Sequence, residues 1–147
     1  MSIELKNVTY TYSPGTSYQI HALKDINLEI PDGQFIGVIG HTGSGKSTLM
    51  NMLGCLDVPT SGEYWLHGQD VSALSDDALS DIRNREIGFI FQGFNLIPNL
   101  TALENVEMAL QICRNPLDAR AVLKEVGLEE RMDNFPAQLS GGEQQRV

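Results

Sequence analysis

Apolar and polar positions alternate along the first thirty residues. The segments IELKNVTYTY (residues 3–12) and ALKDINLEI (22–30) are also rich in β-branched residues, and together these features predict two strands. By contrast, QFIGVIG (34–40) and EIGFIFQ (86–92) are mostly apolar, as strands are when both faces of a parallel sheet are covered. EYWLHGQDV (63–71) predicts a short strand and a turn. We therefore expect the strands to lie before residue 93.

Helical spacing follows the segment 34–40. Apolar residues recur every three or four positions there, at Leu49, Met52, Leu53 and Leu56. Another helix is expected over roughly 75–84, and the residues after Gln92 predict helices only. Strands that alternate with helices in the first part of a chain are typical of an α/β fold.

Capping signals mark the ends of the later helices. The segments TALE (101–104) and SGGE (140–143) have the Ser/Thr-x-x-Glu spacing of a capping box, so a helix is expected to begin at each. Asn115 followed by Pro116 is expected to open another helix, which Gly127 closes.

Length and charge limit the classes of function. The chain has 147 residues, of which 41% are hydrophobic, as in one compact globular domain. A net charge of −9 argues against a nucleic-acid partner. Cys55 and Cys113 lie far apart in apolar helical contexts, which predicts buried thiols in a reducing compartment. The apolar runs are too short to span a membrane, so we expect a cytosolic chain.

The most specific chemical signal is GHTGSGKST, between a predicted buried strand and a helix. Gly40, four further residues, and then Gly45, Lys46 and Ser47 form the pattern of a phosphate-binding loop. Glycines let successive backbone N–H groups approach phosphate oxygens, the lysine neutralises the β- and γ-phosphates of ATP, and the serine hydroxyl ligates Mg²⁺. The residues expected at the phosphates are Gly40, His41, Thr42, Gly43, Ser44, Gly45, Lys46, Ser47 and Thr48. For His41 the backbone, and not the imidazole, is expected to make the contact.

Two later features narrow the choice among the families that have a phosphate-binding loop. Gln92 ends the second mostly apolar segment, and LSGGEQ occupies residues 139–144. With the loop at 40–48, this order and spacing resembles the ATP-binding cassette (ABC) ATPase family over essentially the whole chain. The resemblance implies that Lys46 and Gln92 are catalytic, and that Gln92 contacts Mg²⁺ and water and senses a transmembrane partner.

The LSGGEQ segment resembles the signature motif of that family. Ser140, Gly141 and Gly142 would place a hydroxyl and bare backbone N–H groups at a helix start, where anions bind, and Glu143 follows them. The resemblance implies that this motif binds the γ-phosphate of an ATP held by a second ATPase subunit, in a head-to-tail dimer with two ATP molecules.

The same family commonly stacks the adenine ring on an aromatic residue after the first strand. TYTYSPG offers Tyr12, which fits best because it ends the run, with Tyr10 and Tyr18 as alternatives. Base-on-aromatic stacking contributes roughly 1–3 kcal/mol and tolerates different bases.

Two parts of the chain resemble different members of the family. Residues 47–110 and 135–147 are most similar to the macrolide-export and lipoprotein-release ATPases, whereas 10–48 is closer to the energy-coupling factor ATPases of vitamin and metal-ion import. The export type is favoured for the partner, because the segment after Gln92 contacts the permease in this family. Either type implies a cytoplasmic ATPase held on the inner face of the cell membrane by a permease. The substrate and the direction of transport stay open.

Members of the family continue after the signature with an apolar strand that ends in Asp-Glu and with a switch histidine, and these 147 residues contain neither. We therefore expect the N-terminal part of an ATPase subunit, in which 34–40 lacks its neighbouring strand, ATP binds weakly and the chain tends to aggregate.

Two other functions are alternatives to a transport ATPase. One alternative is a module that binds nucleotide without turnover. Another is a soluble ABC-type ATPase of DNA maintenance, but only 46 residues lie between Gln92 and Leu139, too few for its coiled coil.

The fold expected from these patterns is an α/β P-loop NTPase of the ABC ATPase type, with a mixed or parallel sheet and an inserted helical subdomain. We expect the nucleotide-binding core at 1–92, the helical subdomain at 93–139, and the signature with the start of its helix at 140–147.

Overall fold

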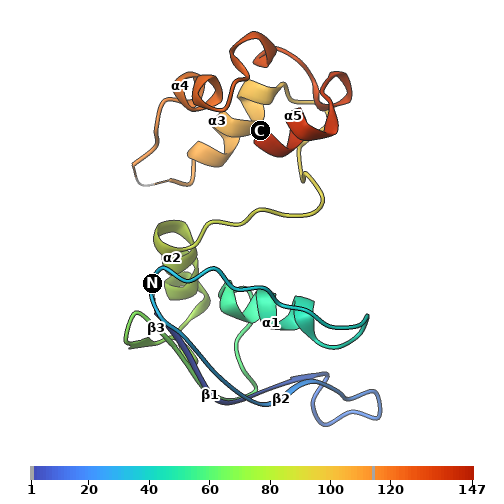
Figure 1. The fold of residues 1–147 in the computed structure, drawn as a ribbon, viewed down its shortest axis with the longest axis vertical. Coiled ribbons are helices and arrows are strands. Elements are labelled where there is room, and N and C mark those ends of the chain that lie inside the picture. Colours follow the sequence, from blue (N-terminus) through green and yellow to red (C-terminus); the bar gives the residue numbers. More distant parts are fainter. Residues whose placement is uncertain (1, 114) are drawn as a thin grey trace. The chain divides into compact units, whose positions relative to one another are not determined.

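The computed structural model describes residues 2–113 and 115–147 and divides the chain into two compact units. The first unit is Met1–Phe89 and the second is Ile90–Val147, and each is described by itself (Figure 1).

The first unit contains a four-stranded antiparallel sheet in the order β2-β1-β3-β4. Its strands are β1 (Ile3–Tyr12), β2 (Ile20–Ile30), β3 (Ser61–Leu66) and β4 (Gln69–Asp70). The long β1–β2 pair runs from Ile3 opposite Ile30 to Tyr12 opposite Ile20. The strands predicted over 3–12 and 22–30 are confirmed. The short strand predicted in 63–71 forms as β3, which begins two residues before that segment, and the turn after it leads to β4.

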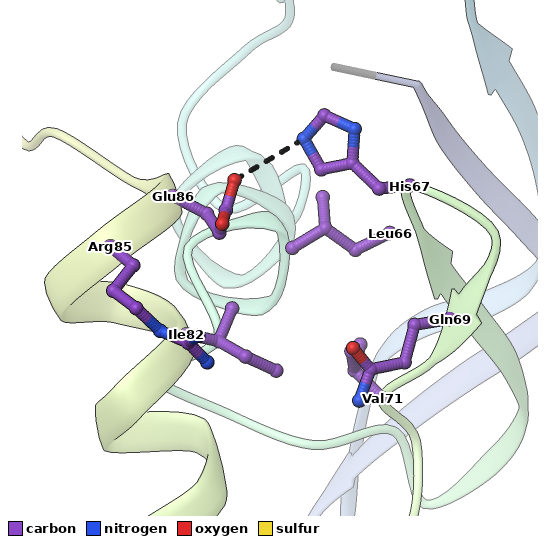
Figure 2. A pocket seen from close by; sticks show the side chains of 7 residues that line it. All are labelled: Leu66, His67, Gln69, Val71, Ile82, Arg85 and Glu86. Carbon is purple, nitrogen blue, oxygen red and sulfur yellow. Dashed lines mark ion pairs between the residues drawn. The ribbon is translucent and has the colours of Figure 1, made fainter.

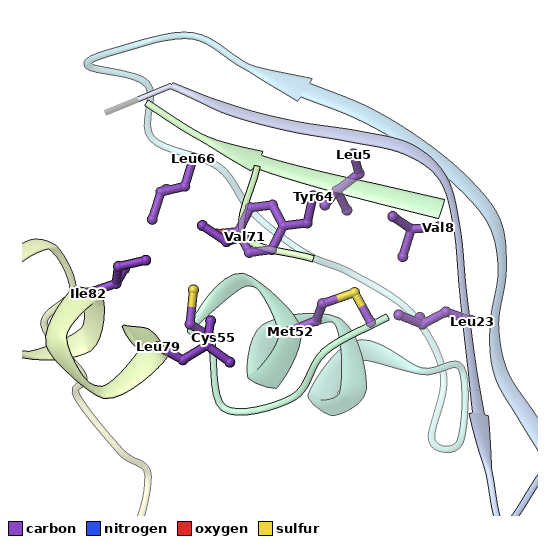
Figure 3. Packing of buried hydrophobic residues seen from close by; sticks show 10 residues of the cluster. All are labelled: Leu5, Val8, Leu23, Met52, Cys55, Tyr64, Leu66, Val71, Leu79 and Ile82. Carbon is purple, nitrogen blue, oxygen red and sulfur yellow. The ribbon is translucent and has the colours of Figure 1, made fainter. Parts of the chain in front are cut away.

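One face of this sheet packs against α1 (Lys46–Leu53) and α2 (Asp76–Glu86) (Figure 3). The core between them consists of Leu5, Val8, Leu23, Met52, Cys55, Tyr64, Leu66, Val71, Leu79 and Ile82. The Tyr64 hydroxyl donates to the carbonyl of Leu53 at 2.8 Å, and Arg83 donates to the carbonyl of Cys55 at 2.6 Å. These bonds tie the end of α1 to the sheet and to α2. Cys55 is buried, as predicted, and its burial raises the pKa of its thiol.

The turn between β3 and β4 faces the last turn of α2 across a cavity of about 210 Å³ (Figure 2). His67 Nε2 in this turn lies 3.6 Å from Glu86 Oε2, and the apolar side of the cavity is made by Leu66, Val71 and Ile82. The pair is about half exposed, so it contributes little stability.

The strands predicted over 34–40 and 86–92 are not formed. Residues 34–40 have no regular structure, Phe35 and Ile39 are 100% and 96% exposed, and Glu86 belongs to α2. A strand is stabilised by hydrogen bonds to its neighbours, and within the described residues the sheet contains only β1 to β4. In this structure these two segments therefore have neither the strand nor the burial that their apolar composition predicts.

The second unit is helical in its described part, as predicted. It consists of α3 (Ala102–Leu110), α4 (Ala119–Glu125), the 3₁₀ turns η1 (Glu129–Arg131) and η2 (Pro136–Gln138), and α5 (Gly141–Arg146). Its core is formed by Leu103, Ala119, Leu123, Leu128 and Met132. Across the described ranges of both units, none of the helices combines the length and the apolar character that crossing a bilayer requires.

Both predicted capping boxes are confirmed. The Thr101 hydroxyl accepts from the backbone N–H of Glu104 at 3.2 Å, and the Glu104 carboxylate accepts from the backbone N–H of Thr101 at 2.7 Å. Ser140 and Glu143 repeat this exchange at the start of α5, at 3.3 and 2.7 Å. The sequence spacing alone was sufficient because a capping box involves only one helical turn.

Two local predictions in the second unit are wrong. The helix expected to open at Asn115 begins instead at Ala119, because the Asp118 carboxylate accepts the backbone N–H groups of the first turn. Cys113 lies beyond the end of α3 and is partly exposed rather than buried in a helix. Gly127, with φ 75°, follows the end of α4 as predicted.

Candidate functional site

The loop that precedes α1 has the backbone geometry that its glycines predict. Gly43 and Gly45 have φ values of 79° and 87°, in the left-handed region that residues with a Cβ rarely adopt. A Cβ on Gly45 would lie only 2.5 Å from the carbonyl oxygen of Ala22, so the loop lies directly against β2. The helix then starts at once, with the backbone N–H of Leu49 bound to the Gly45 carbonyl at 2.8 Å.

The ammonium group of Lys46 is held inside this loop. Its Nζ donates to the carbonyls of Gly40 at 2.7 Å and His41 at 2.8 Å, and lies 3.4 Å from the Ser44 hydroxyl. These bonds concentrate one positive charge where the loop's backbone and the first turn of α1 meet. Backbone N–H groups and a cation at a helix start attract anions.

A cavity of about 310 Å³ lies beside the loop. It is lined by Tyr12, Ile20, His21, Ala22, Gly43, Ser44, Gly45, Lys46, Ser47 and Thr48. Six of the nine residues predicted at the phosphates are therefore brought together here. The described lining residues do not include Gly40, His41 or Thr42, and the His41 ring bonds back to the Thr42 carbonyl at 2.9 Å.

The three candidate tyrosines occupy different places. Tyr12 lines the cavity, and its hydroxyl lies 3.2 Å from the Thr48 hydroxyl of α1. Tyr10 bonds instead to Asp57 at 3.2 Å, and Tyr18 is 83% exposed in the turn between β1 and β2. Tyr12 is the one of the three in position to face a ligand that reaches the loop.

Three further lining residues, Ile20, His21 and Ala22, were not predicted from the sequence. They belong to the start of β2, which runs opposite the end of β1, and Ile20 is the cross-strand partner of Tyr12. Sequence patterns identified both strands, but the register that brings these residues to the loop was not predicted.

The signature segment belongs to the second unit. Ser140, Gly141 and Gly142 are exposed at the start of α5, and Glu143 is half-buried beneath them. The backbone N–H and hydroxyl of Ser140 hold the pKa of the Glu143 carboxyl below its usual value, and Arg131, at 3.3 Å, acts in the same direction.

Gln92 also belongs to the second unit, in an exposed irregular segment, whereas Lys46 and Ser47 belong to the first. In the described part of the chain, no three His, Cys, Asp or Glu side chains gather closely enough to hold a metal ion.

Comparison with known proteins gives consistent matches. The sequence model of a family described as ABC transporter matches residues 23–147. The pyoverdine export ATP-binding/permease protein PvdT of Pseudomonas fluorescens and the macrolide export ATP-binding/permease protein MacB of Haemophilus ducreyi are each 48% identical over 99% of this chain. The chain spans only 23% and 21% of the lengths of these two relatives.

Solved structures match at similar levels of identity. A dimeric structure of MJ0796, described as a bacterial ABC transporter cassette, has a TM-score of 0.84 and 46% identity. A dimeric post-hydrolysis structure of MJ0796 bound to ADP and Pi has a TM-score of 0.82 and 50% identity. Each comparison covers 98% of this chain and 66% of the other.

Proposed function

Because the chain belongs to the ABC transporter family, as an ATP-binding domain of it, we propose that it couples ATP binding and hydrolysis to a membrane permease. The predicted α/β P-loop NTPase fold of the ABC ATPase type is confirmed by the family match and by the superposition on MJ0796. The observation that carries the proposal is the cavity that joins Lys46 and its glycine loop to the ring of Tyr12.

The loop would hold the triphosphate of ATP. Gly43 and Gly45 allow the backbone to approach the phosphate oxygens, and Lys46 would exchange its bonds to the Gly40 and His41 carbonyls for bonds to phosphate. The exchange is favourable because an ammonium bonds more strongly to a charged phosphate than to a neutral carbonyl.

Ser47 would supply a hydroxyl ligand for Mg²⁺ when the nucleotide is bound, and Gln92 stays a predicted second contributor. The bound cation would neutralise charge on the phosphates. The protein's own residues position the nucleotide: Thr48 holds the Tyr12 hydroxyl at 3.2 Å, and the ring of Tyr12 would stack on the adenine.

The signature segment would act on a second subunit. Ser140, Gly141 and Gly142 are exposed, so they are accessible to a γ-phosphate held by the phosphate loop of another copy or of a paralogous ATPase. The dimeric state of the MJ0796 structures supports this proposal. Glu143, whose carboxylate caps the backbone N–H of Ser140, would keep the segment in a helical start.

The partner would be a transmembrane permease, and the ATPase would lie on the cytoplasmic face of the membrane. The names of PvdT and MacB combine an ATP-binding part with a permease part and describe export, which supports an export-type partner for this chain.

Calorimetry with Mg-ATP on Lys46→Ala and on Lys24→Ala tests the phosphate site. Lys24 is an exposed lysine on β2 and serves as a matched control for loss of one charge. We expect Lys46→Ala to weaken affinity by about 10- to 100-fold, the equivalent of roughly 1.5–3 kcal/mol for bonds to a charged group, and Lys24→Ala to leave it unchanged. Equal affinities in the wild type and Lys46→Ala would refute the assignment.

ATP hydrolysis is tested separately from ATP binding. Phosphate release from Mg-ATP, followed with the 147-residue chain and with the complete transporter, separates an ATPase from a module that binds nucleotide without turnover. The complete transporter is expected to release phosphate, and its failure to do so would contradict the proposed coupling of hydrolysis to transport.

A further inference from the structure

Tyr10 and Tyr12 lie two positions apart on β1, so their side chains point to the same face of the sheet. Their ring centroids are 4.9 Å apart and their planes meet at 80°, an edge-to-face contact in the favourable range for aromatic pairs. Tyr10 thus contacts the ring that would stack on the base, although Tyr10 is not among the described residues that line the cavity.

Tyr10 is itself anchored from outside the strand. Its hydroxyl donates to Asp57 Oδ1 at 3.2 Å, and both side chains are partly buried. Burial and the neighbouring Asp57 carboxylate raise the pKa of Tyr10, so the phenol stays protonated and remains a donor. Asp57 lies in the segment that follows α1, 47 residues from Tyr10, and this bond therefore connects the sheet to that segment.

The hydroxyl end of Tyr12 is held by α1 itself. Its hydroxyl lies 3.2 Å from the hydroxyl of Thr48, a buried residue in the first turn of α1. The ring of Tyr12 is therefore restrained at its edge by Tyr10 and at its hydroxyl by Thr48. Thr48 belongs to α1, and Asp57, which holds Tyr10, belongs to the segment after α1. The orientation of the Tyr12 ring is therefore coupled to the helix that follows the phosphate loop.

We propose that Tyr10, held by Asp57, is a positioning residue that sets the orientation of Tyr12 and thereby the contribution of the base to nucleotide affinity. This inference rests on the proposed ATP site. Because Tyr10 contacts neither the loop nor Lys46 in the described contacts, it is expected to affect the base and not the phosphates.

The test compares two probes, Mg-ATP and Mg-tripolyphosphate, which share the phosphates but differ in the nucleoside. Stacking of a base on an aromatic ring accounts for about 5- to 150-fold in affinity, so the wild type should bind Mg-ATP more tightly than Mg-tripolyphosphate. We expect Tyr10→Leu to weaken Mg-ATP binding by about 3- to 10-fold and to leave Mg-tripolyphosphate binding unchanged.

Further variants separate positioning from folding. Tyr10→Phe keeps the edge-to-face contact but loses the bond to Asp57, and should weaken Mg-ATP binding by a smaller factor than Tyr10→Leu. Tyr18→Leu, at an exposed tyrosine, should change neither affinity. If Tyr10→Leu does not fold, Tyr10→Phe alone decides: a selective loss of Mg-ATP affinity supports the inference, and unchanged Mg-ATP affinity overturns it.

Two other outcomes distinguish this inference from the proposed function. An equal loss of affinity for both probes in the Tyr10 variants would show that Tyr10 supports the fold and would overturn the inference, while the ATP site stands. A wild type that binds neither probe would overturn the proposed function, and the positioning role with it.

Discussion

The side-chain amide of Gln145 donates a hydrogen bond to the main-chain carbonyl of Phe91, with 3.3 Å between Nε2 and O, although 54 residues separate them. Close by, a Cβ on Gly141 would lie 3.6 Å from the ring of Phe94, so this ring packs against the start of α5. The segment that contains Gln92 is thus held to the signature helix by two contacts within the second unit.

Gln145→Ala should loosen this segment. Removing one exposed hydrogen bond costs about 0.5–1.5 kcal/mol, so amide hydrogen exchange of residues 90–94 should become faster, by up to about tenfold. Gln111→Ala, at an exposed glutamine just after α3, is the matched control and should leave the exchange unchanged. Exchange at 90–94 that is the same in all three proteins would contradict the role of Gln145.

Gly45→Ala should destabilise the first unit and abolish Mg-ATP binding. A left-handed φ on a residue with a Cβ costs about 1–3 kcal/mol, and the added carbon would also lie 2.5 Å from the Ala22 carbonyl oxygen. Gly15→Ala is the control, because Gly15 also has a positive φ but has open space around its Cβ position. In denaturant unfolding, the free energy of unfolding should fall more for Gly45→Ala than for Gly15→Ala. Equal decreases would mean that the close approach of Gly45 to β2 does not affect stability.

The capped start of α5 should become less stable at acidic pH. Hydrogen bonds from Ser140 lower the pKa of Glu143 below its ordinary value of 4.5, so the carboxylate stabilises the helix start above that pH and loses this effect as the pH falls through the lowered value. An NMR titration of the Ser140 amide should therefore have its midpoint below pH 4.5. Glu143→Gln should abolish this titration and leave the equivalent one at Thr101, which Glu104 caps, intact. A midpoint above 4.5 would contradict the capping role.

The exposed segment 34–40 should promote self-association. Phe35 and Ile39 are almost fully exposed, and contiguous apolar surface of this kind favours pairing with other chains. The double substitution Phe35→Ser and Ile39→Ser should lower the apparent mass in concentration-dependent light scattering. Leu117→Ser, at an exposed leucine outside this segment, should leave the apparent mass unchanged. Equal association of all three proteins would place the association surface elsewhere.

Several features could be predicted from the sequence because they depend on neighbouring residues only. The glycine loop leads into a helix that begins at Lys46, and the capping boxes at Thr101 and Ser140 form with the expected partners. Each involves a few consecutive backbone groups whose conformation the local side chains decide. The β1 and β2 strands were predictable for a related reason, since alternation along a strand reflects one buried and one exposed face.

The tertiary structure decided the features that depend on distant partners. Residues 34–40 have the composition of a buried strand, but a strand forms only where a neighbour supplies hydrogen bonds, and no strand of the described sheet pairs with them. The sequence favours Tyr12 over Tyr10 and Tyr18 because Tyr12 ends the run, but which of the three lies beside the phosphate loop depends on the register of β1 with β2 and on the contacts with α1. Tyr12 lies beside Thr48, Tyr10 beside Asp57, and Tyr18 is exposed. These different surroundings could not be predicted, because contacts between residues far apart in the chain follow from how its elements are placed in space.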